Sequence, residues 1–185
     1  MTEIKAHGTA ELRTERLLLR RYRPEDAPAL YRKFGADPAM AEYSGWNPYA
    51  TPEAARENVD RHIAAYDDER FYGWAIEAEG ALRGTIGAYD DEDDRIKVGF
   101  SIERDCWGKG YATEALKEVL NYLTEEEGIR SVTAWCADEN IGSQRVLEKA
   151  GMRLKAAEKD GLVIGENIFD KLTYEYRGNR PIEGD

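Results

Sequence analysis

The sequence predicts an α+β fold in which a mixed, mostly antiparallel sheet of about seven strands is flanked by about four helices. Alternating apolar residues mark several short strands, helical periodicity marks the segments between them, and no period of the sequence repeats. The chain of 185 residues is long enough for one domain with a sizeable core. We place this domain at residues 11–176, between tails at 1–10 and 177–185 that we expect to be disordered.

The first part of the chain is predicted to form one strand and two helices. Residues 11–22 read as a single strand. The helix after it starts around Pro24 and ends at Gly35. Residues 36–50 form a loop or a short helical turn, and a second helix starts at Pro52.

An antiparallel meander is predicted next, because apolar residues alternate in three successive segments at 72–76, 82–88 and 96–102. Short polar connections join these segments: Glu79-Gly80 between the first two, and an acidic run at 90–94 between the next two.

Helices and strands then alternate to the end of the chain. A helix with an i, i+3, i+4, i+7 apolar stripe begins at Gly110, and a strand follows at 131–137. Residues 140–150 form another helix, and the last two strands are expected at 154–164 and 168–176. The order of elements is therefore β-α-α-β-β-β-α-β-α-β-β.

The acidic composition limits the partners of this chain. The formal net charge is −11, which repels phosphate backbones, so we expect no nucleic-acid partner. The same charge favours cationic ligands. The acidic run at 90–94 is either a solvated hairpin loop or a feature that attracts a basic substrate.

Composition also limits the compartment and the metal chemistry. No apolar run approaches the roughly 18 residues of a membrane helix, and the N-terminus shows no signal-peptide pattern, so we expect no membrane partner. The two cysteines, Cys106 and Cys136, favour a reducing cytoplasm over a disulfide framework. His7 and His62 are the only histidines and no metal-ligand spacing occurs, so we expect no metal.

One motif points to chemistry: CWGKGYATEAL at residues 106–116. Gly108 and Gly110 directly precede a helix. The turn is either an ordinary tight turn or an anion site where free N–H groups of the helix N-terminus face a phosphate. The P-loop pattern is absent, and the dinucleotide fingerprint fails because Thr113 stands where its third glycine should be.

A third pattern fits the motif. The order of elements, WGKGYATEAL at 107–116 and NIGSQRVLEKAGM at 140–152 together resemble the GNAT superfamily of acetyl-CoA-dependent N-acetyltransferases. With TERLLLRRYRPED at 14–26, the resemblance is closest to the branch of ribosomal-protein N-terminal alanine and serine acetyltransferases. It covers about residues 11–176 and implies acetyl-CoA as co-substrate, but it does not identify the acceptor.

The resemblance implies where acetyl-CoA binds. Phe100, Ser101 and Ile102 match the strand that pairs with the pantetheine arm and offers an N–H to the thioester oxygen. Relatives commonly carry a glutamine or arginine three places before the first glycine, where this chain has Asp105. The side-chain contact of that residue is therefore lost, and the neighbouring Arg104 is no evident replacement. The residues that match the pyrophosphate loop and the start of its helix are Trp107, Gly108, Lys109, Gly110, Tyr111, Ala112 and Thr113.

The second motif adds three residues to the implied cofactor site: Asn140, Ser143 and Lys149. Asn140 is also an ordinary helix cap, and Ser143 could instead bond to a helix carbonyl. In the family-based interpretation, Ser143 donates a hydrogen bond to the departing CoA sulfur. Many relatives place a tyrosine acid at the position of Leu147, and this chain does not.

The general base is open, because Lys97 stands where relatives often carry a glutamate. Glu42 is one candidate, and direct attack by the neutral fraction of the amine is the other. Tyr43, Trp46 and Trp135 are expected to line the acceptor cleft.

The sequence therefore predicts a cytoplasmic acyltransferase that moves an acetyl group from acetyl-CoA to a primary amine by direct attack in a ternary complex. The acceptor is a protein N-terminus or other peptide amine, a polyamine or an amine-bearing small molecule. The alternative is a non-catalytic acyl-CoA-binding or sensing domain with the same fold, which Lys97 at the base position would explain. Analogy with the family allows a homodimer.

Overall fold

An eight-stranded sheet forms the framework of the structure, which is a computed structural model that describes residues 6–44 and 47–179. Neighbouring strands follow the order β1-β2-β3-β4-β5-β6-β8-β7, and all pairs are antiparallel except β5 with β6. The strands are β1 (Leu12–Arg13), β2 (Leu18–Arg20), β3 (Tyr72–Ala78), β4 (Ala81–Glu92), β5 (Arg95–Ile102), β6 (Ser131–Ala137), β7 (Arg153–Ile164) and β8 (Asn167–Arg177).

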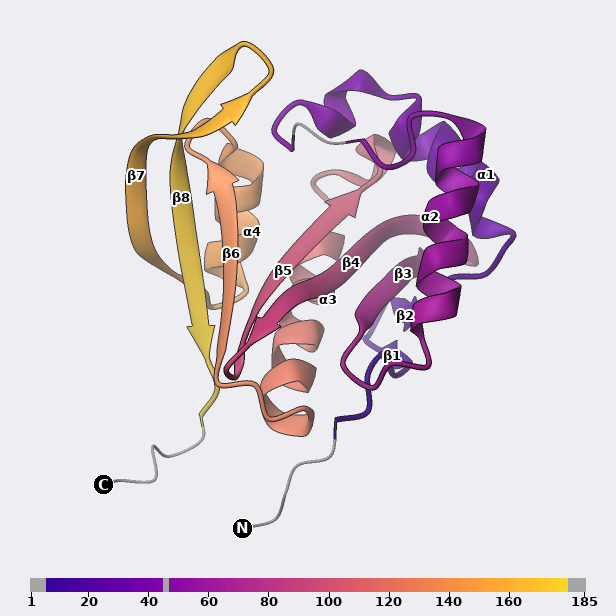
Figure 1. Cartoon of the computed structure of the whole chain (residues 1–185), viewed down its shortest axis with the longest axis horizontal. Coiled ribbons are helices and arrows are strands. Elements are labelled where there is room, and N and C mark those ends of the chain that lie inside the picture. The colour runs from indigo at the N-terminus through magenta and orange to yellow at the C-terminus, as the bar shows by residue number, and fades with distance from the viewer. Residues whose placement is uncertain (1–5, 45–46, 180–185) are drawn as a thin grey trace.

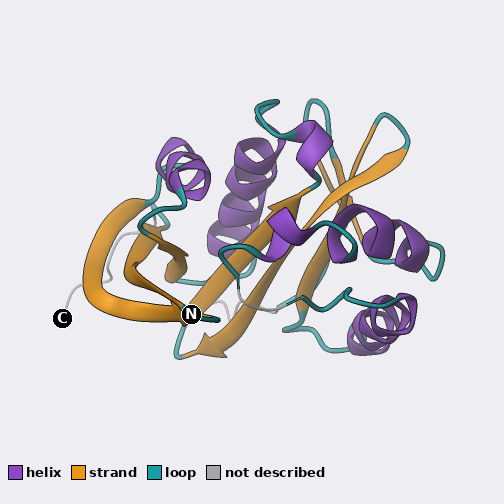
Figure 2. Cartoon of the chain, turned by 90° about the horizontal axis from the view of Figure 1, so that it is seen from above, coloured by secondary structure: helices purple, strands orange, loops and turns teal. Residues whose placement is uncertain are grey.

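Helices cover both faces of this sheet. In Figure 1, α1 and α2 lie in front of β2, β3 and β4, whereas α3 and α4 lie behind the sheet, and Figure 2 shows the same layers from above. The α-helices of the described chain are α1 (Asp26–Leu30), α2 (Pro52–Ala65), α3 (Tyr111–Asn121) and α4 (Ile141–Lys149). Short π-helical turns extend α1 and α3, at Tyr31–Gly35 and Tyr122–Glu126, and 3₁₀ turns occupy Pro38–Ala41 and Arg104–Cys106.

Each face of the sheet has its own apolar core. Behind the sheet, the stripe of α3 packs with buried strand residues such as Trp74, Ile96 and Val98. In front, residues of α1 and α2 such as Leu30 and Val59 pack against β3 and β4. The mixed, mostly antiparallel α+β fold expected from the sequence is therefore confirmed, as is the three-stranded meander β3-β4-β5.

The prediction of one strand over residues 11–22 is wrong, because this segment folds into the hairpin β1-β2. Thr14 causes the reversal: its backbone N–H donates to the carbonyl of Leu17, and its hydroxyl accepts from the Leu17 N–H at 3.1 Å. Such side-chain bonds compete with an extended strand and favour a turn. The split explains why the sheet has eight strands rather than about seven.

Residues 7–9, which the sequence places in the N-terminal tail, contact the folded domain. Thr9 is buried, and its hydroxyl bridges the carbonyl of Phe71 and the N–H of Gly73 at 2.8 and 3.0 Å. The carboxylate of Glu127 accepts bonds from the N–H groups of His7 and Gly8. Residues 7–9 are therefore anchored to the domain. At the other end β8 runs to Arg177, one residue beyond the expected domain boundary.

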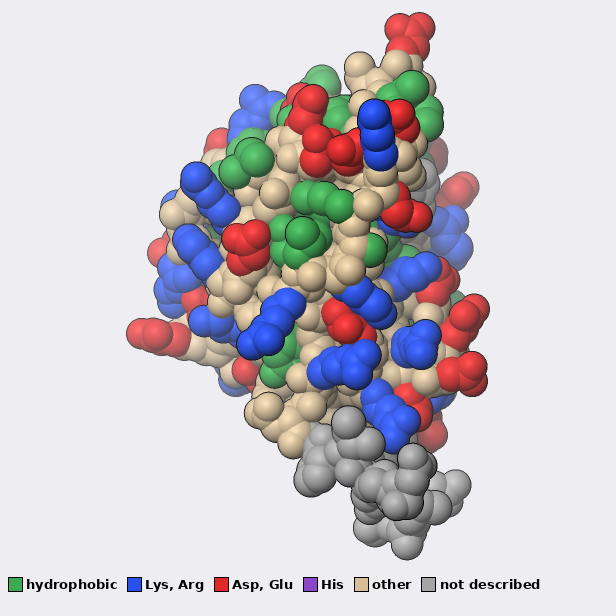
Figure 3. All heavy atoms as spheres, turned by 90° about the vertical axis from the view of Figure 1, so that its left-hand side faces the viewer, with side chains coloured by type: hydrophobic (Ala, Val, Ile, Leu, Met, Phe, Trp, Pro, Cys, Tyr) green, Lys and Arg blue, Asp and Glu red, His purple; other side chains and the backbone are tan. Residues whose placement is uncertain are grey.

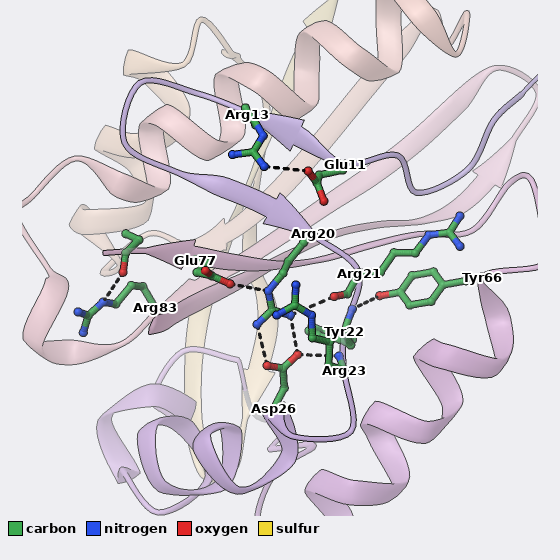
Figure 4. Close-up of polar contacts among 11 residues, drawn as sticks. Glu11, Arg13, Arg20, Arg21, Tyr22, Arg23, Asp26, Tyr66, Glu77 and Arg83 are labelled. Atoms are coloured by element: carbon green, nitrogen blue, oxygen red, sulfur yellow. Dashed lines mark hydrogen bonds and ion pairs between the residues drawn. The ribbon is translucent and has the colours of Figure 1, made fainter. Parts of the chain in front are cut away.

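A buried ion-pair network joins the hairpin to β3 and α1. Arg20 of β2 reaches Glu77 with Nε and Asp26 with both terminal nitrogens, at 2.7 and 2.8 Å (Figure 4). Asp26 also accepts from the backbone N–H of Arg23, which precedes α1. The hairpin position is therefore fixed by charge-assisted hydrogen bonds as well as by apolar packing.

The outer face of β7 and β8 carries interspersed basic and acidic side chains around a few hydrophobic ones (Figure 3). The large apolar side chains exposed on these two strands are Leu154, Val163 and Ile168. No helix in the described ranges is long and apolar enough to cross a membrane.

Candidate active site

The strands β5 and β6 separate part-way along their length. They pair only over residues 95–97 of β5 and 131–133 of β6. Beyond this point β5 stays paired with β4 and β6 stays paired with β8, and Figure 1 shows the two strands diverging. The edge of β5 at residues 98–101 therefore faces β6 with backbone groups that bond to no residue in the described part of the chain. An extended ligand can bind such an edge by main-chain hydrogen bonds.

A glycine turn leads from this edge into α3. Gly108 and Gly110 have φ values of +81° and +82°, in the left-handed region that favours glycine. A Cβ atom on Gly108 would meet nothing within 4 Å, so its surface is open. The preceding Trp107 is exposed, but its indole N–H donates to the carbonyl of Ile102 at 2.7 Å and ties the turn to the end of β5.

The first turn of α3 has free donors. Its cap is Gly110, and no side chain of the described chain caps it, whereas Thr51 caps α2 and Asn140 caps α4. The first helical bond runs from the Glu114 N–H to the carbonyl of Gly110. The N–H groups of residues 108 and 110–113 therefore have no acceptor among residues 6–44 and 47–179. Their partial positive charge suits an anion.

The hairpin β1-β2 also contacts this turn, which the sequence analysis missed. Arg16 donates from Nη1 to the carbonyl of Lys109 at 2.7 Å, although the two residues are 93 positions apart. Sequence spacing gives no indication of this contact; the only available signal was the TERLLLRRY segment shared with the family branch. Arg104, by contrast, is paired with Asp37 before α2, and Lys109 and Lys149 are exposed.

At the start of α4, Asn140 and Ser143 lie as expected. The side chain of Asn140 accepts from the backbone N–H of Ser143 at 3.2 Å. The Ser143 hydroxyl is half-buried and bonds to no residue that the structure describes, whereas Thr124 shows the alternative and bonds back to the carbonyl of Leu120. The bond to a helix carbonyl that would give Ser143 a purely structural role is therefore absent from the described chain.

Strand alternation assigns the other candidates to one side of the sheet. Val98 and Cys136 belong to the core behind the sheet, so Lys97 on β5 and Trp135 on β6 lie on the face of α1 and α2. Trp135 is half-buried, with the ammonium of Lys171 5.8 Å from its ring centroid.

The loop after α1 reaches the same side of the sheet. The ring of Tyr43 packs edge-on against Phe169 of β8, with centroids 5.7 Å apart. Desolvation, together with the charges of Glu42 and Glu139, raises the pKa of Tyr43. Glu139 directly precedes Asn140, the cap of α4, and its charge acts on Tyr43. The loop that carries Tyr43 and the exposed Glu42 therefore faces the start of α4. Trp46, expected in the acceptor wall, lies outside the described residues.

Lys97 and the two cysteine thiols are poorly suited to act as base or nucleophile. The Lys97 ammonium lies 3.1 Å from the Asp90 carboxylate, and this hydrogen bond raises the pKa of Lys97, which therefore stays charged. Burial raises the pKa of the Cys136 thiol to about 11, and burial with the charge of Glu103 raises that of Cys106. Neither thiol is a ready thiolate at neutral pH. The described ranges contain no group of three side chains placed to hold a metal.

The chain resembles known acetyltransferases in sequence and in fold. Residues 16–153 match the family described as acetyltransferase (GNAT) domain. The uncharacterized N-acetyltransferase YoaA of Bacillus subtilis is 30% identical over 167 residues, which cover 88% of this chain and 94% of YoaA.

Two solved structures are similar over almost their whole length. A GNAT-family acetyltransferase from Bacillus anthracis has 26% identity and a TM-score of 0.81, covering 91% of this chain and 98% of its own. The ribosomal L7/L12 α-N-protein acetyltransferase RimL, solved with coenzyme A, has 18% identity and a TM-score of 0.82 with the same coverage. The chain therefore belongs to the GNAT family and is an acetyl-CoA-dependent N-acetyltransferase.

Proposed function

We propose that this enzyme binds acetyl-CoA along the free edge of β5 and across the first turn of α3, and that it transfers the acetyl group to a primary amine. One observation carries the proposal: the partner-free edge of β5 leads through Gly108 and Gly110 directly to the partner-free amides of α3. An extended pantetheine arm requires the first feature, and a pyrophosphate requires the second.

The glycine turn and the start of α3 provide hydrogen-bond donors and a positive charge that suit the phosphates of acetyl-CoA. The amides of Gly108, Gly110, Tyr111, Ala112 and Thr113 supply hydrogen bonds to phosphate oxygens. Trp107 and Lys109 are exposed beside them, so that the Lys109 ammonium can add a positive charge in a chain that is otherwise strongly acidic. Asn140 and Lys149 would lie on the α4 side of the bound molecule.

The reaction proposed here is direct attack. The amine nitrogen forms a bond to the thioester carbonyl carbon, the carbon–sulfur bond breaks, and the amine loses a proton. Negative charge builds on the carbonyl oxygen, where a backbone N–H from the Phe100–Ile102 segment of β5 can stabilise it. The buried thiols of Cys106 and Cys136, with their raised pKa values, favour this route over an acyl-cysteine.

Ser143 is the proposed donor to the departing sulfur. Its hydroxyl is half-buried at the start of α4 with no partner in the described chain, and Leu147, where many relatives carry a tyrosine, is a fully buried apolar residue. A thiol of pKa about 8.5 leaves more readily when a hydrogen bond stabilises its thiolate.

The acceptor is proposed to approach from the face that carries α1 and α2, past Tyr43 and Trp135. These aromatic rings suit an amine with an apolar or cationic body. Protein N-termini, polyamines and small amines all meet this description. The RimL structure is that of an enzyme acting on a ribosomal protein N-terminus, which favours a peptide amine among them. Glu42 is the proposed base if the enzyme supplies one.

The phosphate loop can be tested by charge. Gly108→Asp places a carboxylate on the open surface of the glycine turn, beside the amides proposed to bind the pyrophosphate, so acetyl-CoA affinity measured by calorimetry should fall on the order of 100-fold or more. Gly80→Asp is the matched control, because Gly80 in the β3-β4 turn also has a positive φ (+74°) and open surroundings, and it is not part of the proposed CoA site. A folded Gly108→Asp variant with unchanged affinity would refute the proposed site.

The role of Ser143 can be tested by removing its hydroxyl. Ser143→Ala should lower kcat by on the order of 10²-fold while the KM for acetyl-CoA changes little, because the donor acts on the charge that develops on sulfur. Gln144→Ala, which alters the same helical turn and removes a bond to the Asp138 carbonyl, should leave kcat near that of the wild type. An unaltered kcat in Ser143→Ala would contradict the donor role.

The base can be identified from pH–rate profiles with acceptors of different amine pKa. If Glu42 is the base, kcat/KM should inflect below pH 7 for every acceptor, and Glu42→Gln should remove the inflection and cost on the order of 10²-fold. If the neutral amine attacks unaided, the profile should instead rise to the pKa of each amine. Inflections below pH 7 that survive Glu42→Gln would contradict both versions.

A further inference from the structure

We propose that Arg16 is a positioning residue for the CoA pyrophosphate: it fixes the Lys109–Gly110 peptide so that the Gly110 N–H faces the ligand. This inference rests on the proposed function of the glycine turn. Arg16 belongs to the turn between β1 and β2, outside both motifs that point to CoA binding.

The Arg16 guanidinium is held against the turn by several independent contacts. Nη1 donates to the carbonyl of Lys109 at 2.7 Å, and Nε donates to Oε2 of Glu114 at 2.6 Å. The guanidinium carbon lies 4.8 Å from the ring centroid of Tyr111, in a cation–π contact. A Cβ atom built on Gly110 would come within 3.3 Å of Nη2. The side chain therefore lies directly beside the peptide that begins α3.

The hydrogen bond from Arg16 to the Lys109 carbonyl also fixes the direction of the Gly110 N–H, because both groups belong to one peptide unit. In a planar trans peptide the C=O and N–H groups point in opposite directions. Because Arg16 holds the carbonyl of Lys109, the N–H of Gly110 in the same peptide must point away from the β1-β2 hairpin. That N–H has no acceptor in the described chain, and Gly110 is the residue with free rotation into the left-handed region. Without Arg16, this peptide could turn over and present its carbonyl to the phosphates.

Arg16 also neutralises the Glu114 carboxylate, which lies close to the proposed phosphate site. A carboxylate in the first turn of α3 would repel a bound anion if it were unpaired. Burial opposes its ionisation, but hydrogen bonds from Thr14 and Arg16 outweigh burial and lower the pKa of Glu114. The Thr14 hydroxyl and the Arg16 backbone N–H both donate to Oε1, at 2.6 and 2.9 Å. The paired carboxylate thus anchors the arginine, and the arginine neutralises the carboxylate.

The test compares ligands with and without the pyrophosphate. Arg16→Gln should weaken CoA binding, measured by calorimetry, about tenfold, the equivalent of one hydrogen bond of ordinary strength. Turnover of acetyl-pantetheine, which lacks the pyrophosphate, should keep its kcat/KM, because β5 and Ser143 are unaltered. Arg13→Gln is the matched control: Arg13 lies on the same hairpin, is exposed and pairs with Glu11 (Figure 4). It should bind CoA like the wild type.

Three outcomes would overturn the inference. CoA affinity could be unchanged in Arg16→Gln, acetyl-pantetheine turnover could fall as much as CoA affinity, or Arg13→Gln could have the same effect. The second outcome would show that Arg16 only stabilises the fold. If Arg16→Gln does not fold, Arg16→Lys replaces it: one ammonium cannot reproduce the fork to Lys109 and Glu114, so CoA should bind several-fold more weakly, and unchanged affinity would again overturn the inference.

Failure of this inference is distinguishable from failure of the proposed function. If Gly108→Asp abolishes CoA binding and Arg16→Gln does not weaken it, the site stands and the role of Arg16 falls. If neither variant affects CoA binding, the glycine turn itself is not the phosphate site.

Discussion

Beyond residue 97, β5 has a neighbouring strand on only one side, and the arrangement of the site follows from this. β4 keeps β5 in the sheet, while β6 stays paired with β8 and diverges from β5. Neighbouring strands twist relative to one another, so two strands that lose their common hydrogen bonds separate further with each residue. An unpaired strand edge inside a sheet would be unfavourable in a dry core, and here it is available to an extended ligand.

The glycine turn and the start of α3 also present backbone groups that have no partner in the described chain. Two residues with positive φ and a helix start without a side-chain cap would weaken an isolated helix. Contacts on the side away from the free amides offset this: Trp107 bonds to the end of β5, and the β1-β2 hairpin holds Lys109 and Glu114 through Arg16. The turn is therefore ordered while its amides remain free. Such preorganised donors stabilise a bound anion without having to reorient.

Most of the framework could be predicted from the sequence, because it depends on local patterns. Alternation identified β3, β4 and β5, helical spacing identified α3, and the helix starts predicted at Pro52 and Asn140 agree with α2 and α4. The hairpin β1-β2 was missed because a single hydroxyl, that of Thr14, decides between a continuous strand and a turn.

The parts that could not be predicted depend on contacts between distant segments. Arg16 and Glu114 are 98 positions apart, and the residues around Thr9 are held by groups more than 60 positions away. Nothing in the local sequence of either segment specifies these partners. The free hydroxyl of Ser143 is a similar case, since a serine in the first turn of a helix can bond to the backbone or leave its hydroxyl free, and only the surroundings decide which occurs.

The most direct measurement of the central claim is amide-resolved NMR of the isotopically labelled enzyme titrated with CoA. Hydrogen bonds to phosphate should shift the backbone amide resonances of Gly108 and residues 110–113 downfield and protect them from exchange, with further changes along residues 98–101. The amides at the start of α2, which Thr51 caps, should not change. Saturating CoA that leaves the amides of residues 108–113 unperturbed, while others respond, would contradict the account.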